Sequence, residues 1–146
     1  MRSKILHDAP ERTIALVLDR GDEVMASLQR FALEHALTAS RLTAIGAFES
    51  AVLGWFDWER KDYERIPVRE QVEALSLVGD IALDEQGRPK VHVHAVLGRR
   101  DGSAVGGHLL EARVRPTLEV IVTDSPSWLR RVCDPVSGLA LIRIGD

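Results

Sequence analysis

The sequence predicts a single domain over residues 1–146, of the α/β (α+β) class, in which a mainly antiparallel β-sheet packs with one long helix. Only one stretch has the apolar spacing of an amphipathic helix, whereas about eight short runs are rich in β-branched and aliphatic residues, as strands are. Because tight turns join most consecutive runs, neighbouring strands are expected to pair antiparallel. A chain of 146 residues with 45% apolar content is long enough to enclose one core.

The first expected elements are a strand and the helix. Residues 12–18 form a compact aliphatic run that predicts a buried strand. Asp22 follows as a candidate N-cap of the helix. In that helix Val24, Leu28 and Phe31 recur at i, i+4 and i+7, which predicts an apolar stripe that faces the core.

The rest of the chain is expected to form strands and turns. Residues 42–48 and 51–58 predict two strands joined around Glu49-Ser50. Residues 63–68 predict a short edge strand, because Pro67 cannot donate to a strand ladder. The other expected strands are residues 72–83, residues 117–123 and a final hairpin of residues 128–133 and 139–144.

Four aromatic residues lie close together in the sequence: Trp55, Phe56, Trp58 and Tyr63. Such residues can stack on bases, but strand aromatics more often pack against a helix or another subunit, and packing is the prediction here. The run 51–58 is apolar on both faces. It therefore indicates that another subunit covers the outer face.

Three of the five histidines lie within 17 residues, in a stretch that predicts a β-hairpin. His92 and His94 are two residues apart, so on a strand both side chains point to one face. Asp101-Gly102 is a turn signal, after which the chain returns through two glycines to His108. Three neutral imidazoles at one point suit a divalent metal, above all Zn²⁺, and leave a fourth coordination position open.

The length of the turn decides whether these histidines can meet. A two-residue loop would place His108 on the opposite face of the hairpin from His94. A three-residue loop of residues 100–102 would set His94 directly opposite His108, and Gly102 suits the left-handed residue that ends such a loop. Since a slip of one residue moves every side chain to the other face, the metal hypothesis predicts the three-residue loop or a bulge.

The net charge of −3 argues against strong non-specific binding to nucleic acid. The charge is uneven, however: residues 1–87 carry a net −6, and residues 88–131 a net +4. A basic face for weak DNA contacts is one interpretation, and solvated arginines at strand ends are the other. The candidate nucleic-acid-binding residues are Arg99, Arg100, Arg113 and Arg115.

Two further features bear on the compartment. The single cysteine, Cys133, cannot form an internal disulfide, which fits a reducing cytoplasm. No run approaches the ~20 apolar residues of a membrane helix, and the first residues lack the apolar run of a signal peptide. We therefore expect a cytoplasmic protein with no membrane contact.

The order of several segments resembles the plants-and-prokaryotes conserved (PPC) domain family over about residues 10–144. The matching segments are residues 44–48, 52–57, 73–82, 87–94, 101–109, 117–121 and 138–139. The resemblance implies an α/β fold with a mainly antiparallel sheet and a homotrimer. In prokaryotic members the positions of His92, His94 and His108 look like a metal cluster, which plant members usually lack.

The family is usually described as DNA-binding, and in plants the domain often accompanies an AT-hook. Residues 86–89 contain only the last three core residues of that motif, Gly87-Arg88-Pro89. They are expected to form a hairpin turn instead. With no hook, any DNA binding is expected to be weak and non-specific.

Three functions remain open from the sequence. The first is a metal-binding, trimeric module with a regulatory or DNA-associated role. The second is a metal-dependent hydrolase or lyase acting on a small molecule, for which Glu73, Glu111 and Glu119 are candidate general bases. In the third, the metal is structural and the protein is a scaffold. Cupins also have His-x-His, but they add a glutamate where this chain has Leu97 and Gly98.

Overall fold

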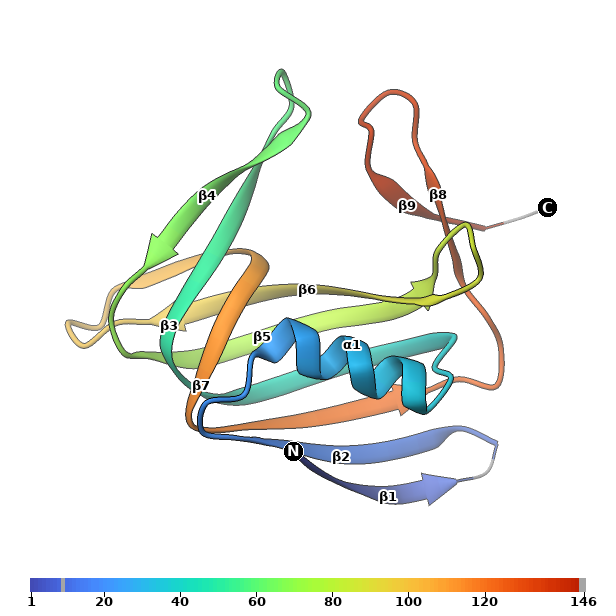
Figure 1. Ribbon diagram of the computed structural model, residues 1–146, viewed down its shortest axis with the longest axis horizontal. Helices are drawn as coiled ribbons and strands as arrows, with labels where there is room; N and C mark the ends of the chain where they lie inside the picture. The colour runs from blue at the N-terminus through green and yellow to red at the C-terminus, as the bar shows by residue number, and fades with distance from the viewer. Residues whose placement is uncertain (9, 145–146) are drawn as a thin grey trace.

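The computed structural model describes residues 1–8 and 10–144, and in this part the chain forms a nine-stranded sheet and one α-helix (Figure 1). The helix is α1, Val24–Glu34. The strands are β1 Arg2–Asp8, β2 Arg12–Asp19, β3 Ala39–Asp57, β4 Asp62–Val68, β5 Val72–Leu83, β6 Pro89–Gly98, β7 Ala104–Asp124, β8 Arg130–Cys133 and β9 Ala140–Arg143. The predicted class is therefore correct.

The strand order is β1-β2-β7-β3-β5-β8-β9, with β4 beside β3 and with β6 between β5 and β7. Among the described residues every strand pairing is antiparallel except one parallel contact between Leu83 of β5 and Arg130 of β8. Strands β3, β5, β6 and β7 pair in a closed ring, because β6 joins β5 to the beginning of β7. Strand β6, which carries two of the predicted metal ligands, is thus held on both sides.

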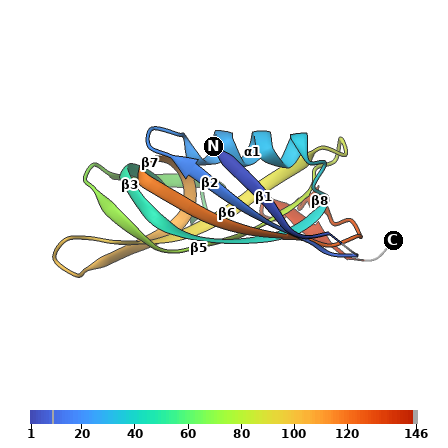
Figure 2. The same ribbon diagram turned by 90° about the horizontal axis from the view of Figure 1, so that it is seen from below.

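Helix α1 lies on one face of the sheet (Figure 2). Its predicted stripe is correct: Val24, Leu28 and Phe31 are all buried in the core. The core continues through aliphatic residues of the strands, among them Leu16 and Leu77. No helix in the described part of the chain has the length and apolar character needed to cross a bilayer.

The predicted N-cap was wrong by one residue. The cap is Glu23, whose carboxylate accepts a hydrogen bond from the backbone N–H of Ala26 at 2.6 Å. Asp22 is engaged elsewhere, because its carboxylate accepts from the backbone N–H of Asp19 at 3.0 Å and closes the turn after β2. Glu23 also accepts from the backbone N–H of Ala112 at 3.2 Å, so the same side chain ties the helix to β7.

The turn expected around Glu49-Ser50 was also wrong, since β3 runs through these residues as one strand. The strand absorbs its change of direction in irregular pairings around Phe48 instead of in a turn. Likewise, residues 117–123 are only the end of the long strand β7. At the bend, Gly46 allows the two strands to approach closely: a Cβ there would lie 2.2 Å from the carbonyl oxygen of Thr117.

The remaining predicted elements agree with the structure. Residues 72–83 coincide with β5, the edge strand is β4, and the final hairpin is β8 and β9. Strand β1 was missed, because its sequence alternates only weakly between apolar and polar residues. The partial hook motif at residues 86–89 is a turn, closed by hydrogen bonds from the backbone N–H groups of Gln86 and Arg88 to Asp84.

The double role of Glu23 predicts the effect of its removal. Replacing Glu23 with alanine should lower the free energy of unfolding by about 1 kcal/mol, which corresponds to a fall in Tm of about 2–4 °C. Thermal unfolding followed by circular dichroism measures this. The matched control is Glu34→Ala at the other end of α1, which should not lower Tm; an equal loss in both variants would contradict the capping role.

Candidate metal centre

The hairpin that carries the histidines has the predicted three-residue loop. Strands β6 and β7 pair with His94 directly opposite His108, and the backbone N–H of Arg99 donates to the carbonyl of Ser103 at 2.8 Å. Gly102 has φ +84°, the left-handed conformation that glycine adopts without strain. This register is the one in which His92, His94 and His108 share a face of the hairpin.

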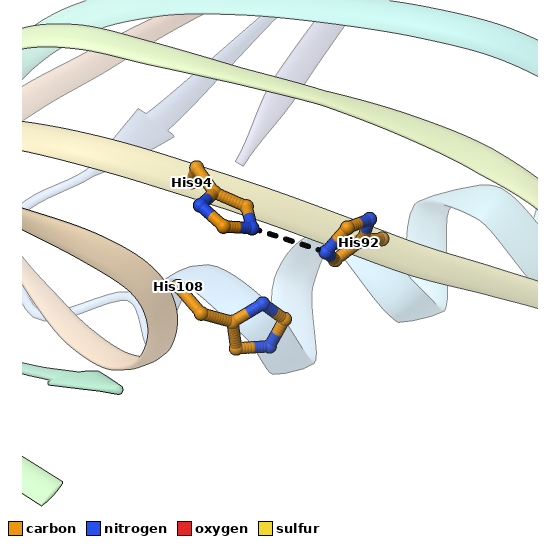
Figure 3. Close-up of side chains that lie close together, drawn as sticks. All are labelled: His92, His94 and His108. Atoms are coloured by element: carbon orange, nitrogen blue, oxygen red, sulfur yellow. Dashed lines mark hydrogen bonds between the residues drawn. The ribbon is translucent and has the colours of Figure 1, made fainter. Parts of the chain in front are cut away.

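The three imidazoles lie together, with one potential ligand atom from each within 4.8 Å of the others. Nε2 of His92 and Nε2 of His94 are 3.2 Å apart, and Figure 3 shows both rings, together with that of His108, turned toward a common point. Two nitrogens bound tetrahedrally to Zn²⁺ at about 2.0–2.1 Å would be about 3.3 Å apart. The observed separation therefore fits a tetrahedral metal site.

His108 is held in the form that a metal ligand needs. Burial, with the nearby positive charges of His92, His94, Arg131 and Lys90, lowers its pKa to about 4, so the ring is neutral at pH 7. Its Nδ1 is buried and has no hydrogen-bond partner among the described residues. A buried nitrogen without a partner is costly in a metal-free protein, and a bound ion would satisfy it.

His94 is also held neutral. Burial, followed by repulsion from His92, lowers the pKa of His94 below its usual value. Metal ligation requires the unprotonated ring. The same burial that costs a charged histidine free energy thus favours an uncharged donor set.

Asp80 and Arg131 support His92 from behind. Arg131 is buried and forms an ion pair with Asp80, and its Nη2 lies 3.1 Å from Nδ1 of His92. An oxygen of Asp80 lies 3.7 Å from the same Nδ1. Burial raises the pKa of Asp80, but hydrogen bonds to His92 and Arg131 and the charge of Arg131 outweigh it, and the net pKa is lowered. Asp80 is therefore ionised, and its negative charge 3.7 Å from Nδ1 favours the tautomer of His92 that carries its proton there and leaves Nε2 free for a metal.

Tyr63 forms one wall of the site. Its ring stacks on that of His108 with centroids 4.6 Å apart and an interplanar angle of 24°. The close approach depends on Gly54, because a Cβ there would lie 2.8 Å from Cδ1 of Tyr63. The ring of Phe56 packs edge-on against that of Tyr63, with the ring centroids 5.4 Å apart. Two of the four aromatic residues thus pack at the site, whereas Trp55 and Trp58 are 60% and 54% exposed.

A cavity of about 700 Å³ opens beside the three histidines. Its apolar walls include Trp55 and Phe56 from β3 and Leu141 from β9, and its polar lining includes Lys90 and Arg131. No acidic side chain lines it among the described residues. The volume is in the range of pockets that hold small organic molecules.

The other predicted site residues do not gather here. The three candidate general bases lie outside the cavity lining, and Glu111 pairs with Arg65. Of the candidate DNA contacts, Arg99 pairs with Glu70 at 3.2 Å, and Arg113 with Glu49 at 3.8 Å. The others, Arg100 in the β6–β7 turn and Arg115 in β7, have no acidic partner among the described residues.

The sequence interpretation missed Asp80 as a partner of the histidines and Tyr63 as a stacking partner, and it counted Arg131 only as part of a charge excess. Asp80 pairs with His92 across β5 and β6, so its place depends on strand register. Arg131 arrives from β8, about 40 residues further along the chain. Local sequence spacing carried no signal for either.

Comparisons with known proteins agree with this structure. The family model of the Plants and Prokaryotes Conserved (PCC) domain, which describes the family's sequences, matches residues 7–126 of this chain. A search of the curated proteins found no match.

Three solved structures illustrate the likeness. The chain is similar to a metal-containing protein from Archaeoglobus fulgidus, with 35% identity, coverage of 90% of this chain and 93% of the other, and a TM-score of 0.82. A PPC protein from Pyrococcus horikoshii is 26% identical, with coverage of 99% and 96% and a TM-score of 0.85. A candidate DNA-binding protein from Ralstonia eutropha JMP134 is 29% identical, with coverage of 90% and 91% and a TM-score of 0.83. The chain therefore belongs to the Plants and Prokaryotes Conserved (PCC) domain family, which is the PPC family that its sequence motifs resemble.

Proposed function

We propose that the protein binds a divalent metal, zinc, through His92, His94 and His108, and serves as a regulatory or DNA-associated binding module. The observation that carries the proposal is the 3.2 Å separation of the His92 and His94 Nε2 atoms, with the unpartnered nitrogen of His108 beside them. Three imidazole donors suit Zn²⁺ in a site that keeps an open position. The metal-containing protein from A. fulgidus supports the proposal by its likeness.

The chain's own residues prepare the site in three ways. Burial keeps His94 and His108 neutral and therefore able to ligate. The negative charge of Asp80 beside Nδ1 of His92 favours a proton on that nitrogen. Tyr63 stacks against His108 and limits its rotation. A bound metal supplies positive charge and Lewis acidity beside the cavity.

A binding role is favoured over the metal-dependent hydrolase or lyase that the sequence left open. The carboxylates that the sequence offered as its general base would have to lie within hydrogen-bond reach of the reacting molecule. The described residues lining the cavity include no carboxylate, and Glu73, Glu111 and Glu119 are absent from it. Asp80 lies behind His92 and is occupied by Arg131.

We also propose that residues 1–146 act as a single domain, and that it assembles as a homotrimer in the cytoplasm. Three side chains of the sheet support the assembly: Ile45, Val78 and Ile121 are 62%, 49% and 41% exposed. Val78 and Ile121 both pair with Thr43, so the three lie on one sheet face, which we call the outer patch. Trp55 is 60% exposed as well. A second subunit would cover such a patch.

The metal site makes a direct prediction. Protein prepared without chelators should contain close to one zinc per chain, and His94→Ala should contain much less, because two histidines alone hold the ion weakly. Elemental analysis by mass spectrometry measures the stoichiometry. His35→Gln is the matched control, since His35 stacks on Phe31 at the end of α1 and should not change metal content. Unchanged zinc in His94→Ala would overturn the proposal.

Asp80 should act through His92 and not as a ligand. Asp80→Asn keeps the shape of the side chain but removes the charge that stabilises a proton on Nδ1 of His92. The dissociation constant for zinc should rise about 10–100-fold, which competition with a chromophoric chelator measures. Asp84→Asn, in the turn after β5, is the control and should leave zinc affinity unchanged.

The trimer is tested by mass in solution. Sedimentation equilibrium at micromolar concentration should give three times the 16.2 kDa of one chain. Ile121→Glu should shift the mass toward the monomer, because a charge would be buried in the outer patch. Val136→Glu changes a 62% exposed residue in the β8–β9 turn and should leave the trimer intact. A monomeric wild-type protein would refute the assembly.

DNA binding should be weak. With two of the four candidate arginines paired to glutamates and a net charge of −3, we expect a Kd of about 10⁻⁵ M or weaker near physiological salt. Replacing both Arg100 and Arg115 with glutamine should flatten the salt dependence by about two units and weaken all DNA sequences alike. Fluorescence anisotropy with two unrelated duplexes measures both. Tight, sequence-selective binding would contradict this prediction.

A further inference from the structure

The charged side chains that line the cavity are both positive, and only one of them has an acidic partner among the described residues. Lys90 lines the cavity and has no acidic partner among the described residues. Arg131 is 6% exposed, and although its Nη2 pairs with Asp80, its Nε is buried without a hydrogen-bond partner. A buried polar atom without a partner at the edge of a cavity favours a ligand that supplies an acceptor.

A metal held by three histidines would add to this charge. Neutral imidazoles donate electron pairs but no negative charge, so the ion would keep both of its positive charges. The nearby carboxylate of Asp80 is paired with Arg131, and no acidic side chain among the described residues lines the cavity, so the charge of the ion would be balanced from outside. An anion would balance it, whereas a cation would be repelled.

The rest of the lining is apolar and aromatic. Trp55 and Phe56 form one wall, and Leu139 and Leu141 of the C-terminal hairpin form another. A fully hydrated inorganic ion would not use these surfaces. A cavity of about 700 Å³ with a charged end and apolar walls fits a molecule with an acidic group and a small hydrophobic body.

We propose that this cavity binds a small organic anion, with its acidic group beside Lys90 and the three histidines and its apolar body against Trp55, Phe56 and Leu141. The proposal deepens the proposed function and rests on it for the charge of the metal, while Lys90 and Arg131 contribute independently of the metal. Such an anion would be the signal that a regulatory module binds, and it would fill the cavity between β3 and the β8–β9 hairpin.

Isothermal titration calorimetry with matched probes tests the proposal. The zinc content of the sample is measured first. Benzoate and phenylphosphonate then serve as anions with the same ring, benzamide as the neutral isostere, and acetate as the anion without a ring. We expect at least one ring-bearing anion to bind at least tenfold more tightly than benzamide and acetate, and the preferred anion identifies the acidic group as carboxylate or phosphonate-like.

Two variants locate the binding. Lys90→Gln should weaken the preferred anion about fivefold or more without changing zinc content, since Lys90 is not a predicted ligand. Lys61→Gln is the matched control, because Lys61 lies over Trp58 outside the cavity lining and should change nothing. Unaltered anion affinity in Lys90→Gln would overturn the assignment.

The outcomes separate this inference from the proposed function. Zinc bound as predicted, with benzamide binding as well as benzoate and phenylphosphonate or with no probe binding, would overturn the anion proposal alone. A protein without zinc would overturn the proposed function. The same titrations on that metal-free protein would still decide the anion proposal through Lys90 and Arg131, and a tenfold preference for an anion over benzamide would uphold it.

Discussion

The pairing register of β6 with β7 is the constraint on which the site depends. With the three-residue loop, His94 lies opposite His108, and a shift of one residue would carry His108 to the other face. The register is set locally by the turn, in which Gly102 adopts a left-handed conformation and Asp101 accepts a hydrogen bond from the backbone N–H of Ser103. It is then held by β5 on the other side of β6. A short turn thus determines whether three imidazoles can share one ion.

The parts of the protein that the sequence predicted are those set by local rules. The helix stripe follows from the spacing of Val24, Leu28 and Phe31, and the histidine hairpin follows from a period of two and a glycine turn. Strand β5 has the predicted limits because its run ends in turn residues on both sides. The metal hypothesis needed nothing beyond this hairpin geometry.

The parts of the protein that the sequence did not predict depend on contacts between residues far apart in the chain. Strand β3 is continuous because its two halves change partners at Phe48, from β5 to β4, and a bulge takes the place of the expected turn. Asp80 meets His92 through the β5–β6 register, and Arg131 reaches both from β8. Neighbouring residues in the sequence do not encode such meetings, which only the closed ring of strands brings about.

The same distinction applies to charge. The excess of basic residues between 88 and 131 suggested a basic face, yet Arg88, Arg99 and Arg113 pair with acidic residues in the folded chain. Arg131 is buried against Asp80 and His92, and Lys90 beside them has no acidic partner in the part of the chain that the structure describes. Part of the positive charge that the sequence suggested for DNA contacts on the surface therefore lies around a partly open cavity. Because a cavity desolvates its contents, each charge there acts more strongly on a small anion than a solvated arginine acts on DNA.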